Sequence, residues 1–343
     1  MILRATLAAF AVTLLASCSK TPADSASGKD ASAPLASPAK GARLKIAVVP
    51  KGTTHEFWKA VHAGAVKASR ELDVDIVWKG PLKEDDLKAQ VDVVSTFTAQ
   101  GVSGIVLAPL NDTALKAPVH AAVASKIPVV VFDSDLGGDD HVSFVATDNQ
   151  AAGRLAGDAM AKAVGDKGGS VVVLRYQEGS ASTANREKGF LESVKAKPNL
   201  TVASDNQYGG ATTESAFQKS ESLLLAQKAQ DGRIAGVFTP NESTTFGMLQ
   251  ALRKSNVAKK VRFVGFDASE KLVSALREGD IDALVVQKPF DMGYVAVRTM
   301  VAHLRGEKVD KRVDTGARVV TKADLEDPAV KELLAPDLAK WLE

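Results

Sequence analysis

Short apolar runs alternate with helix-period stretches along most of the chain. The runs are continuous in Val, Ile and Leu, as in "KIAVV" and "PVVVF", which is typical of parallel strands buried on both faces. They predict strands at 44–50, 74–80, 104–110, 128–135, 143–148, 169–177, 200–208, 236–241, 261–267 and 282–289. Apolar residues spaced by three and four predict helices at 56–71, 84–99, 150–164, 182–196, 211–229, 242–255 and 268–278.

These strand–helix units form two successive series. Alternating β and α units indicate a parallel sheet with helices on both faces. Two series therefore predict an α/β protein with two similar doubly wound lobes, a multi-strand hinge and a cleft between the lobes. We expect chain crossovers at 146–153, 287–291 and 315–320. The predicted N-terminal lobe comprises 43–147 with 290–317, and the predicted C-terminal lobe comprises 148–289 with 318–343.

The first forty-two residues differ in composition from the rest. Arg4 precedes the apolar stretch "ATLAAFAVTLLA", which predicts a secretory signal peptide over 1–17. The following "LASC" resembles a bacterial lipobox, and Cys18 is the only cysteine, so we predict that Cys18 is lipidated. An ordinary signal peptide with Cys18 incidental is the alternative. Residues 18–42, rich in Ala, Ser and Pro, are predicted to form a flexible tether.

Composition narrows the functional classes. The chain has 343 residues, 24% charged, with a formal net charge of +2, and no basic stripe indicates nucleic-acid binding. Beyond the signal peptide no apolar run is long enough to span a membrane, so we predict membrane attachment through the lipid anchor only. The sequence lacks a phosphate loop, a nucleophile elbow and histidines at metal-binding spacing, so we predict no enzyme, no cofactor and no metal.

Polar and aromatic residues gather after the predicted strands. In open α/β sheets, ligands bind beyond the carboxyl ends of the strands. Carboxylates accept from hydroxyls, guanidinium groups donate and amides do both, while aromatic faces cover the C–H surfaces of a sugar ring. The mix predicts a neutral polyhydroxylated ligand. The candidate ligand-binding residues are His55, Phe57, Trp58, Asp133, Arg186, Tyr208, Asn241, Asp267 and Gln287.

The helix predicted over 56–71 carries adjacent aromatic residues at its start. Phe57 belongs to the apolar stripe of this helix, whereas Trp58 lies about 100° away from it. We therefore predict that Trp58 avoids the core face and lies at the mouth of the cleft. Thr53 and Glu56 fit a capping box.

Several motifs resemble one known family. "IPVVVFDSD", "VATDNQAAGRLAGD", "GSASTANREKGF" and "VGFDAS", in this order, resemble periplasmic sugar-binding proteins of the ribose-binding type, class I periplasmic binding proteins that serve ABC importers. The resemblance covers nearly the whole chain after the tether. It implies Phe57 and Trp58 on one face of a sugar and Tyr208 near the other. Around the hydroxyls it implies Asp133, Arg186, Asn241, Asp267 and Gln287.

The resemblance also implies a role and a location. It indicates a monomer in the periplasm or at the cell surface, anchored by lipid to a bacterial membrane, that delivers a small neutral sugar or polyol to an ABC permease. A receptor that loads a chemoreceptor or sensor kinase is the alternative. His55 stands where members often carry Asn, and Ser134 where ribose binders carry Arg. These departures mean that ribose itself is not implied.

Overall fold

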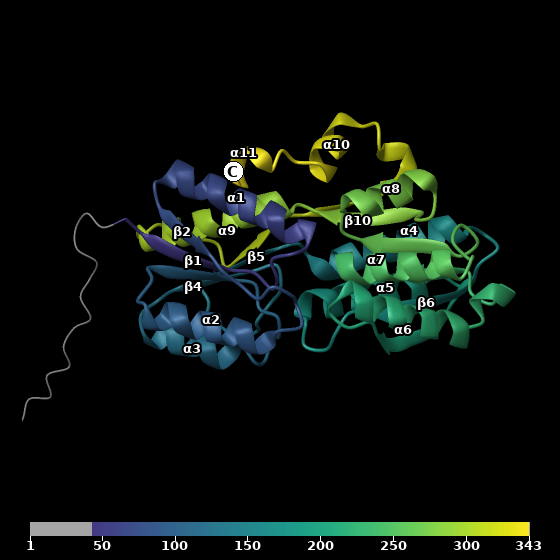
Figure 1. Ribbon diagram of the computed structural model, residues 1–343, viewed down its shortest axis with the longest axis horizontal. Coiled ribbons are helices and arrows are strands. Elements are labelled where there is room, and N and C mark those ends of the chain that lie inside the picture. The colour runs from purple at the N-terminus through teal and green to yellow at the C-terminus, as the bar shows by residue number, and fades with distance from the viewer. Residues whose placement is uncertain (1–42, 343) are drawn as a thin grey trace, which may run out of the picture. The chain divides into compact units, whose positions relative to one another are not determined.

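The structure, a computed structural model, describes residues 43–342 (Figure 1). The predicted signal peptide, Cys18 and the tether lie outside the described residues. Within 43–342, no helix combines the length and the apolar character needed to cross a membrane.

The first lobe is built on a six-stranded parallel sheet in the order β11-β5-β4-β3-β1-β2. Helices α1 (Glu56–Leu72) and α9 (Pro289–Leu304) pack on one face, and α2 (Leu87–Ala99) and α3 (Lys116–Ala124) on the other. Both layers of helices are visible in Figure 1. The strands are β1 (Lys45–Val49), β2 (Asp75–Trp78), β3 (Gly104–Leu107), β4 (Val129–Phe132), β5 (Ser143–Ala146) and β11 (Arg312–Asp314).

The second lobe repeats this plan in the order β12-β10-β9-β8-β6-β7, with only β12 antiparallel to its neighbour. Its strands are β6 (Gly169–Arg175), β7 (Leu200–Tyr208), β8 (Gly236–Phe238), β9 (Arg262–Phe266), β10 (Ala283–Gln287) and β12 (Ala317–Thr321). One face carries α4 (Asn149–Val164) and α5 (Ala181–Lys195). The other carries α6 (Thr213–Ala226), α7 (Glu242–Lys254) and α8 (Glu270–Glu278). Short 3₁₀ turns occupy Ala229–Asp231 and Lys322–Asp324.

These sheets confirm the predicted fold class of two similar α/β lobes. Each predicted strand and helix is present, with shorter bounds for most strands. Strands β11 and β12 were not predicted as strands, and α3 and α9 were not predicted as helices. The chain passes between the sheets after β5, after β10 and between β11 and β12.

Glycines allow two helix pairs to pack with their backbones in contact. A Cβ on Gly64 of α1 would lie 1.9 Å from the carbonyl oxygen of Phe290 in α9. A Cβ on Gly153 of α4 would lie 2.1 Å from the carbonyl oxygen of Arg186 in α5. Only glycine fits at such close approaches. The first contact fixes the position of α1, which begins at the cleft. The second fixes the backbone of Arg186, a candidate ligand-binding residue.

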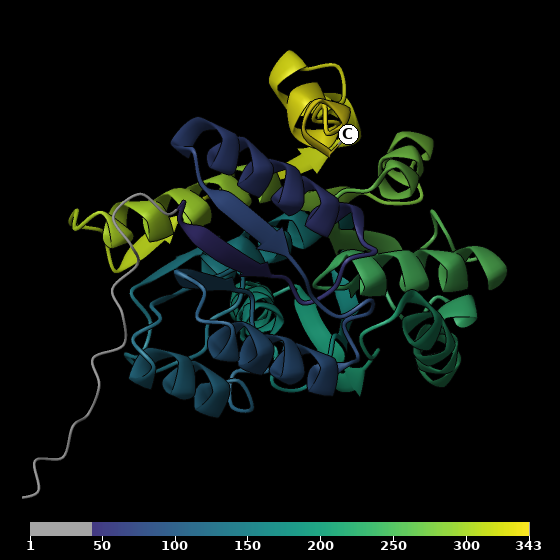
Figure 2. The same ribbon diagram turned by 60° about the vertical axis from the view of Figure 1, so that its left-hand side comes forward.

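The C-terminal segment contacts both lobes (Figures 1 and 2). Helix α10 (Pro328–Leu334) packs on the second lobe, where Val330 is fully buried in the core beside α6–α8. Helix α11 (Ala339–Leu342) instead lies against α1, because Arg70 donates hydrogen bonds to the carbonyls of Lys340 and Trp341 at 3.1 and 3.2 Å. The sequence predicts that all of 318–343 belongs to the second lobe, whereas its last helix, α11, contacts α1 of the first lobe.

Candidate functional site

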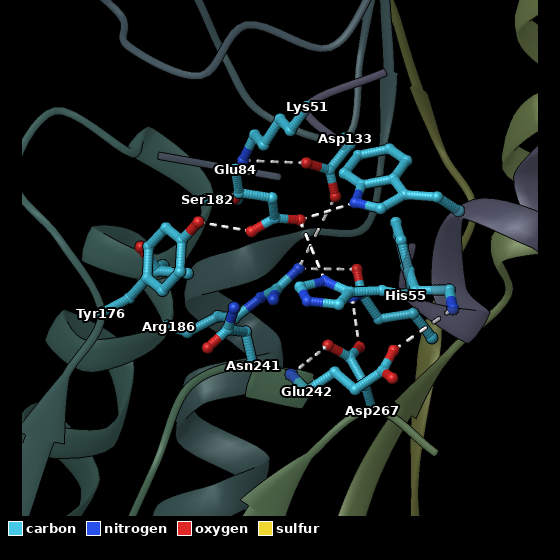
Figure 3. Close-up of a pocket in the computed structure, with 14 residues that line it drawn as sticks. Lys51, His55, Glu84, Asp133, Tyr176, Ser182, Arg186, Asn241, Glu242 and Asp267 are labelled. Atoms are coloured by element: carbon cyan, nitrogen blue, oxygen red, sulfur yellow. Dashed lines mark hydrogen bonds and ion pairs between the residues drawn. The ribbon is translucent and has the colours of Figure 1, made fainter. Parts of the chain in front are cut away.

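A narrow cavity of about 30 Å³ lies between the lobes, at the carboxyl ends of both sheets (Figure 3). Eight of the nine candidate residues line it. The first lobe contributes His55, Phe57, Trp58 and Asp133, and the second contributes Arg186, Asn241, Asp267 and Gln287. The cavity is also lined by residues that the sequence analysis missed, namely Lys51, Glu84, Tyr176, Ser182, Thr183 and Glu242.

Tyr208 lies outside this cavity. It is the last residue of β7, an edge strand of the second sheet, and pairs in register with Arg175. The Arg175 guanidinium lies 5.0 Å from the centre of the Tyr208 ring, within cation–π distance. Strand pairing therefore holds Tyr208 at the sheet edge. Tyr176, the residue directly after β6, is instead the tyrosine that lines the cavity.

The two candidate aspartates share an unusual backbone geometry. Asp133 follows β4 with φ +60°, and Asp267 follows β9 with φ +67°. This left-handed region is disfavoured for most residues but tolerated by Asp, and strained residues of this kind concentrate at functional sites. The turn ends each strand abruptly and leaves its carboxylate facing the cavity.

Arg186 is held at the cavity by acceptors on three different elements. Its Nε donates to Asn149 Oδ1 at 2.8 Å, its Nη1 to the carbonyl of Pro240 at 3.0 Å and its Nη2 to Gln287 Oε1 at 2.7 Å. The guanidinium carbon lies 4.4 Å from the centre of the Phe266 ring. Gln287 in turn donates to Asp267 Oδ1 at 2.7 Å. The guanidinium fork is therefore pre-oriented before any ligand arrives.

Lys51 forms a buried ion pair within the first lobe and a hydrogen bond to the second. Its Nζ lies 3.0 Å from Asp133 Oδ2, and the two side chains are 4% and 5% exposed. The same ammonium donates to Ser182 Oγ in the second lobe at 3.1 Å. Charge at this end of the cavity is thus already neutralised within the protein.

Glu84 accepts hydrogen bonds from three residues that line the cavity. Its Oε1 accepts from Trp58 Nε1 at 2.6 Å and lies 3.3 Å from His55 Nδ1. Its Oε2 accepts from the hydroxyl of Tyr176. In Figure 3 the carboxylate lies between the Tyr176 hydroxyl and the His55 ring.

The Glu84–His55 pair holds both groups in their charged forms. Burial alone lowers the pKa of His55, but attraction and hydrogen bonding to Glu84 outweigh burial and raise it to about 9. Burial alone raises the pKa of Glu84, but His55, with help from Lys51 and Tyr176, lowers it to about 2. The imidazolium and the carboxylate therefore persist together across neutral pH.

Two acidic groups at the opposite end of the cavity accept hydrogen bonds from backbone N–H groups. Asp267 Oδ2 accepts from the backbone N–H of Glu242 at 3.0 Å, and Glu242 Oε2 accepts from the backbone N–H of Phe57 at 3.2 Å. Burial raises the pKa of Glu242 to about 7, with Asp267 adding to the shift and His55 opposing it. Burial also raises the pKa of Asp267, against the attraction of Arg186.

The start of α1 differs from the sequence prediction in two respects. The predicted capping box is wrong, because α1 begins at Glu56 after His55, whose side chain does not cap the helix, and Thr53 donates to the carbonyl of Pro81. The prediction that Trp58 avoids the core face is also wrong. Trp58 is 2% exposed and packs edge-to-face on Phe57 and Phe132 at 4.8 and 6.2 Å. Helix α1 packs on the sheet and also against α9. Its buried surface is therefore wider than the single apolar stripe that the sequence predicts.

Residues 43–342 contain no group of three or more His, Cys, Asp or Glu side chains placed to hold a metal ion.

Comparison with known proteins agrees with this geometry. Residues 46–308 match the family described as "Periplasmic binding protein domain". A ribose import binding protein from Haemophilus influenzae is 27% identical over 277 residues, which cover 81% of this chain and 91% of that protein.

Solved structures are similar as well. A carbohydrate transporter solute-binding protein from Agrobacterium radiobacter, in complex with D-arabinose, is 35% identical with a TM-score of 0.81, covering 86% of this chain and all (100%) of that one. An ABC transporter solute-binding protein from Agrobacterium vitis with bound D-fucose is 34% identical with a TM-score of 0.80, covering 85% of this chain and 100% of that one.

Proposed function

Because this chain belongs to the periplasmic binding protein family, we propose that it captures a small neutral sugar or polyol outside the cytoplasm and delivers it to an ABC importer. The ligand would bind in the interlobe cavity, with the lobes closing around it. The family supports a binding role and no catalytic one. The names of the relatives, which include an import protein and transporter components, favour transport over the signalling alternative.

The pairing of charges in the cavity carries the proposal. Lys51 is paired with Asp133, His55 with Glu84, and the charge of Arg186 is offset by Asp267. Three of the five N–H groups of Arg186 are used within the protein. No cation lining the cavity is left over for a phosphate or carboxylate ligand. The carboxylates and amides instead suit hydroxyl donors, whose burial requires partners because an unpaired buried polar group costs about 1–3 kcal/mol. The D-arabinose and D-fucose bound to the two similar proteins support the same ligand class.

The candidate residues have corresponding proposed roles. Phe57 and Trp58 would cover one face of the sugar. Asp133, Arg186, Asn241, Asp267 and Gln287 would bind its hydroxyls. Tyr208 is not part of this proposal, because it lies away from the cavity.

The anchor, the lobe boundaries and the oligomeric state belong to the same proposal. Cleavage after residue 17 and lipidation of Cys18 would tether a monomer to the membrane through 18–42. The N-terminal lobe would comprise 43–147 with 290–317, and 148–289 with 318–343 would form the other, apart from the docked last helix.

A ligand panel tests the proposal. Calorimetry and thermal melting would compare D-arabinose, D-fucose, other neutral sugars and polyols with sugar phosphates and amino acids. A neutral ligand at 100 times its dissociation constant should stabilise the protein by about 2.7 kcal/mol. Tight binding of an anionic ligand, with no response to any neutral one, would overturn the proposal.

Two variants then test the site itself. Asp133→Ala and Asp267→Ala should each weaken binding roughly 10- to 150-fold, because charged hydrogen bonds contribute about 1.5–3 kcal/mol. Asp92→Ala, which alters an exposed carboxylate far from the cavity on α2, is the matched control and should bind like the unmodified protein. Unchanged affinity in both site variants would refute the assignment.

A further inference from the structure

Glu84 is the only buried member of a run of charged loop residues. The loop between β2 and α2 reads "KGPLKEDD", and Leu82 beside it is 67% exposed. Glu84 is nevertheless 6% exposed. A buried carboxylate without partners would be strongly unfavourable, so its burial depends on the groups that surround it.

Those groups come from both lobes. Trp58 and His55 belong to the first lobe, as Glu84 does, whereas Tyr176 follows β6 of the second lobe. A second bond, from Gln177 Nε2 to the backbone carbonyl of Glu84 at 3.4 Å, also crosses the cleft. The bonds to Trp58 and His55 are therefore independent of closure, while the bonds to Tyr176 and Gln177 require the lobes to be together.

We propose that Glu84 is a positioning residue for ligand capture, which fixes Trp58 and His55 against the cavity within the first lobe and engages Tyr176 when the second lobe closes. The proposal rests on the proposed function, because it concerns the same cavity. Through Glu84, the loop at 79–86 would thus control the orientation of Trp58 and His55 in the cavity.

A carboxylate is required for this arrangement. The indole N–H of Trp58 and both N–H groups of an imidazolium are donors only. Glutamine at position 84 could still accept from Trp58 and His55 through its oxygen and donate to the Tyr176 hydroxyl. It would lack the negative charge that holds His55 as an imidazolium and strengthens all three hydrogen bonds. The charge of His55 would then depend on the acids that remain around it, Glu242 and Asp267, which act on it less strongly than Glu84 does. Glu84 itself also faces Lys51, whose ammonium would keep Asp133 as its partner.

Titration of His55 tests the first half of the proposal without any ligand. NMR of the mature ligand-free protein would follow the imidazole in the unmodified chain, in Glu84→Gln and in Asp85→Asn. Asp85 is the exposed neighbour on the same loop, so Asp85→Asn removes the same charge at the surface. Glu84→Gln should lower the midpoint by at least one pH unit, and Asp85→Asn should leave it in place. An unchanged midpoint in Glu84→Gln overturns the proposal.

A double-mutant cycle tests the second half, with D-arabinose as the probe. Glu84→Gln and Tyr176→Phe should each weaken binding, Glu84→Gln by roughly 10- to 100-fold. The double variant should bind about as weakly as Glu84→Gln alone, because both changes act on the same charged hydrogen bond across the cleft. Multiplicative losses would show that Glu84 and Tyr176 act separately and would overturn this part.

Two further outcomes remain informative. If Glu84→Gln does not fold, Glu84→Asp keeps the charge on a shorter side chain and should retain a high His55 midpoint while losing the coupling to Tyr176. Loss of neither property in Glu84→Asp would contradict the proposal. If no sugar of the panel binds the unmodified protein, the proposed function fails, and the His55 titration still decides the role of Glu84.

Discussion

Glu242 of the second lobe accepts a hydrogen bond from the backbone N–H of Phe57 in the first lobe, at 3.2 Å. Glu56 of the first lobe does the same for the second, since its Oε2 accepts from the backbone N–H of Glu270 at 3.2 Å. Each lobe therefore supplies a carboxylate to the N-terminus of a helix in the other, where the helix dipole favours negative charge. Closure of the cleft forms these two caps together.

The first prediction concerns the pH dependence that Glu242 brings. Its pKa is raised to about 7, so the folded protein binds this proton more tightly than the unfolded chain does. Its contribution to stability is fully present below about pH 4.5 and is lost as the pH rises through about 7. Glu242→Gln should therefore increase the free energy of unfolding at pH 8 by about 1–2 kcal/mol, allowing for solvent screening, and have little effect at pH 4.5.

Urea denaturation at the two pH values would measure this effect. The glutamine oxygen can still accept from Phe57, so the cap itself is retained. Glu270→Gln, at an exposed position on α8, is the control and should show no such pH dependence. An equal effect of Glu242→Gln at both pH values would contradict the prediction.

The buried pair of Lys51 and Asp133 leads to the second prediction. Lys51→Met would leave the Asp133 carboxylate buried, with Arg186 4.0 Å away as its nearest remaining cation. Breaking one side of a buried pair typically costs about 3–5 kcal/mol. Lys51→Met/Asp133→Leu should regain much of this stability, because an apolar pair carries no desolvation penalty, but it should not regain ligand binding.

Guanidinium denaturation would compare these variants with a surface control. Lys88→Met breaks an exposed pair with Asp92, for which we expect a change below about 0.5 kcal/mol. The interpretation fails if Lys51→Met and Lys88→Met have the same effect.

The third prediction concerns the contact between α1 and α9. Gly64→Ala would place a methyl group 1.9 Å from the carbonyl oxygen of Phe290, so the two helices would have to separate. We expect a loss of about 1–3 kcal/mol in stability. Ligand affinity should also fall, because α1 carries Phe57 and Trp58 into the cavity. Lys59→Ala, at an exposed position of the same helix, should be nearly neutral in chemical denaturation, and equal stability of the two variants would show that the helix contact adapts freely.

The fourth prediction concerns the anchor. Cys18→Ala should prevent lipidation and release the folded protein from the membrane fraction. Its affinity for the ligand should not change. Mass spectrometry of the mature N-terminus and detergent phase partitioning would detect the change. An unlipidated N-terminus in the unmodified protein, cleaved at another position, would exclude the anchor.

Sequence patterns predicted ten strands, most of them because they are continuous apolar segments; β7, "LTVASDNQY", is the clearest exception. Strands β11 and β12, "RVD" and "ARVVT", are shorter and partly exposed, so only pairing with β5 and β10 identifies them. Helix α9 was not predicted, because Pro289 in "QKPFD" indicates a crossover and not a helix start. In the structure this proline occupies the first turn, where a missing N–H is tolerated.

Site residues could be predicted from the sequence where they directly follow a strand. Asp133, Asn241 and Asp267 come directly or shortly after apolar strands, and parallel strands bring their carboxyl ends together. Glu84 was not predictable, because nothing in "KEDD" distinguishes the one acid that turns inward. The relevant signal was the indole of Trp58, since a buried tryptophan N–H usually needs an acceptor. Glu242 was missed because its main contact, Phe57, belongs to the other lobe.

The attachment of the last helix to the first lobe limits how far the lobes can move. Helix α10 is fixed to the second lobe by Val330, and α11 to the first by Arg70. Only five residue steps separate Leu334 from Ala339, a length of chain that reaches at most about 18 Å when fully stretched. This short segment therefore limits how far α10 and α11 can separate. If the lobes separate further than this on the side of α10 and α11, the hydrogen bond between Arg70 and Trp341 must break. The width of the open cleft is therefore set by a short piece of chain outside both sheets.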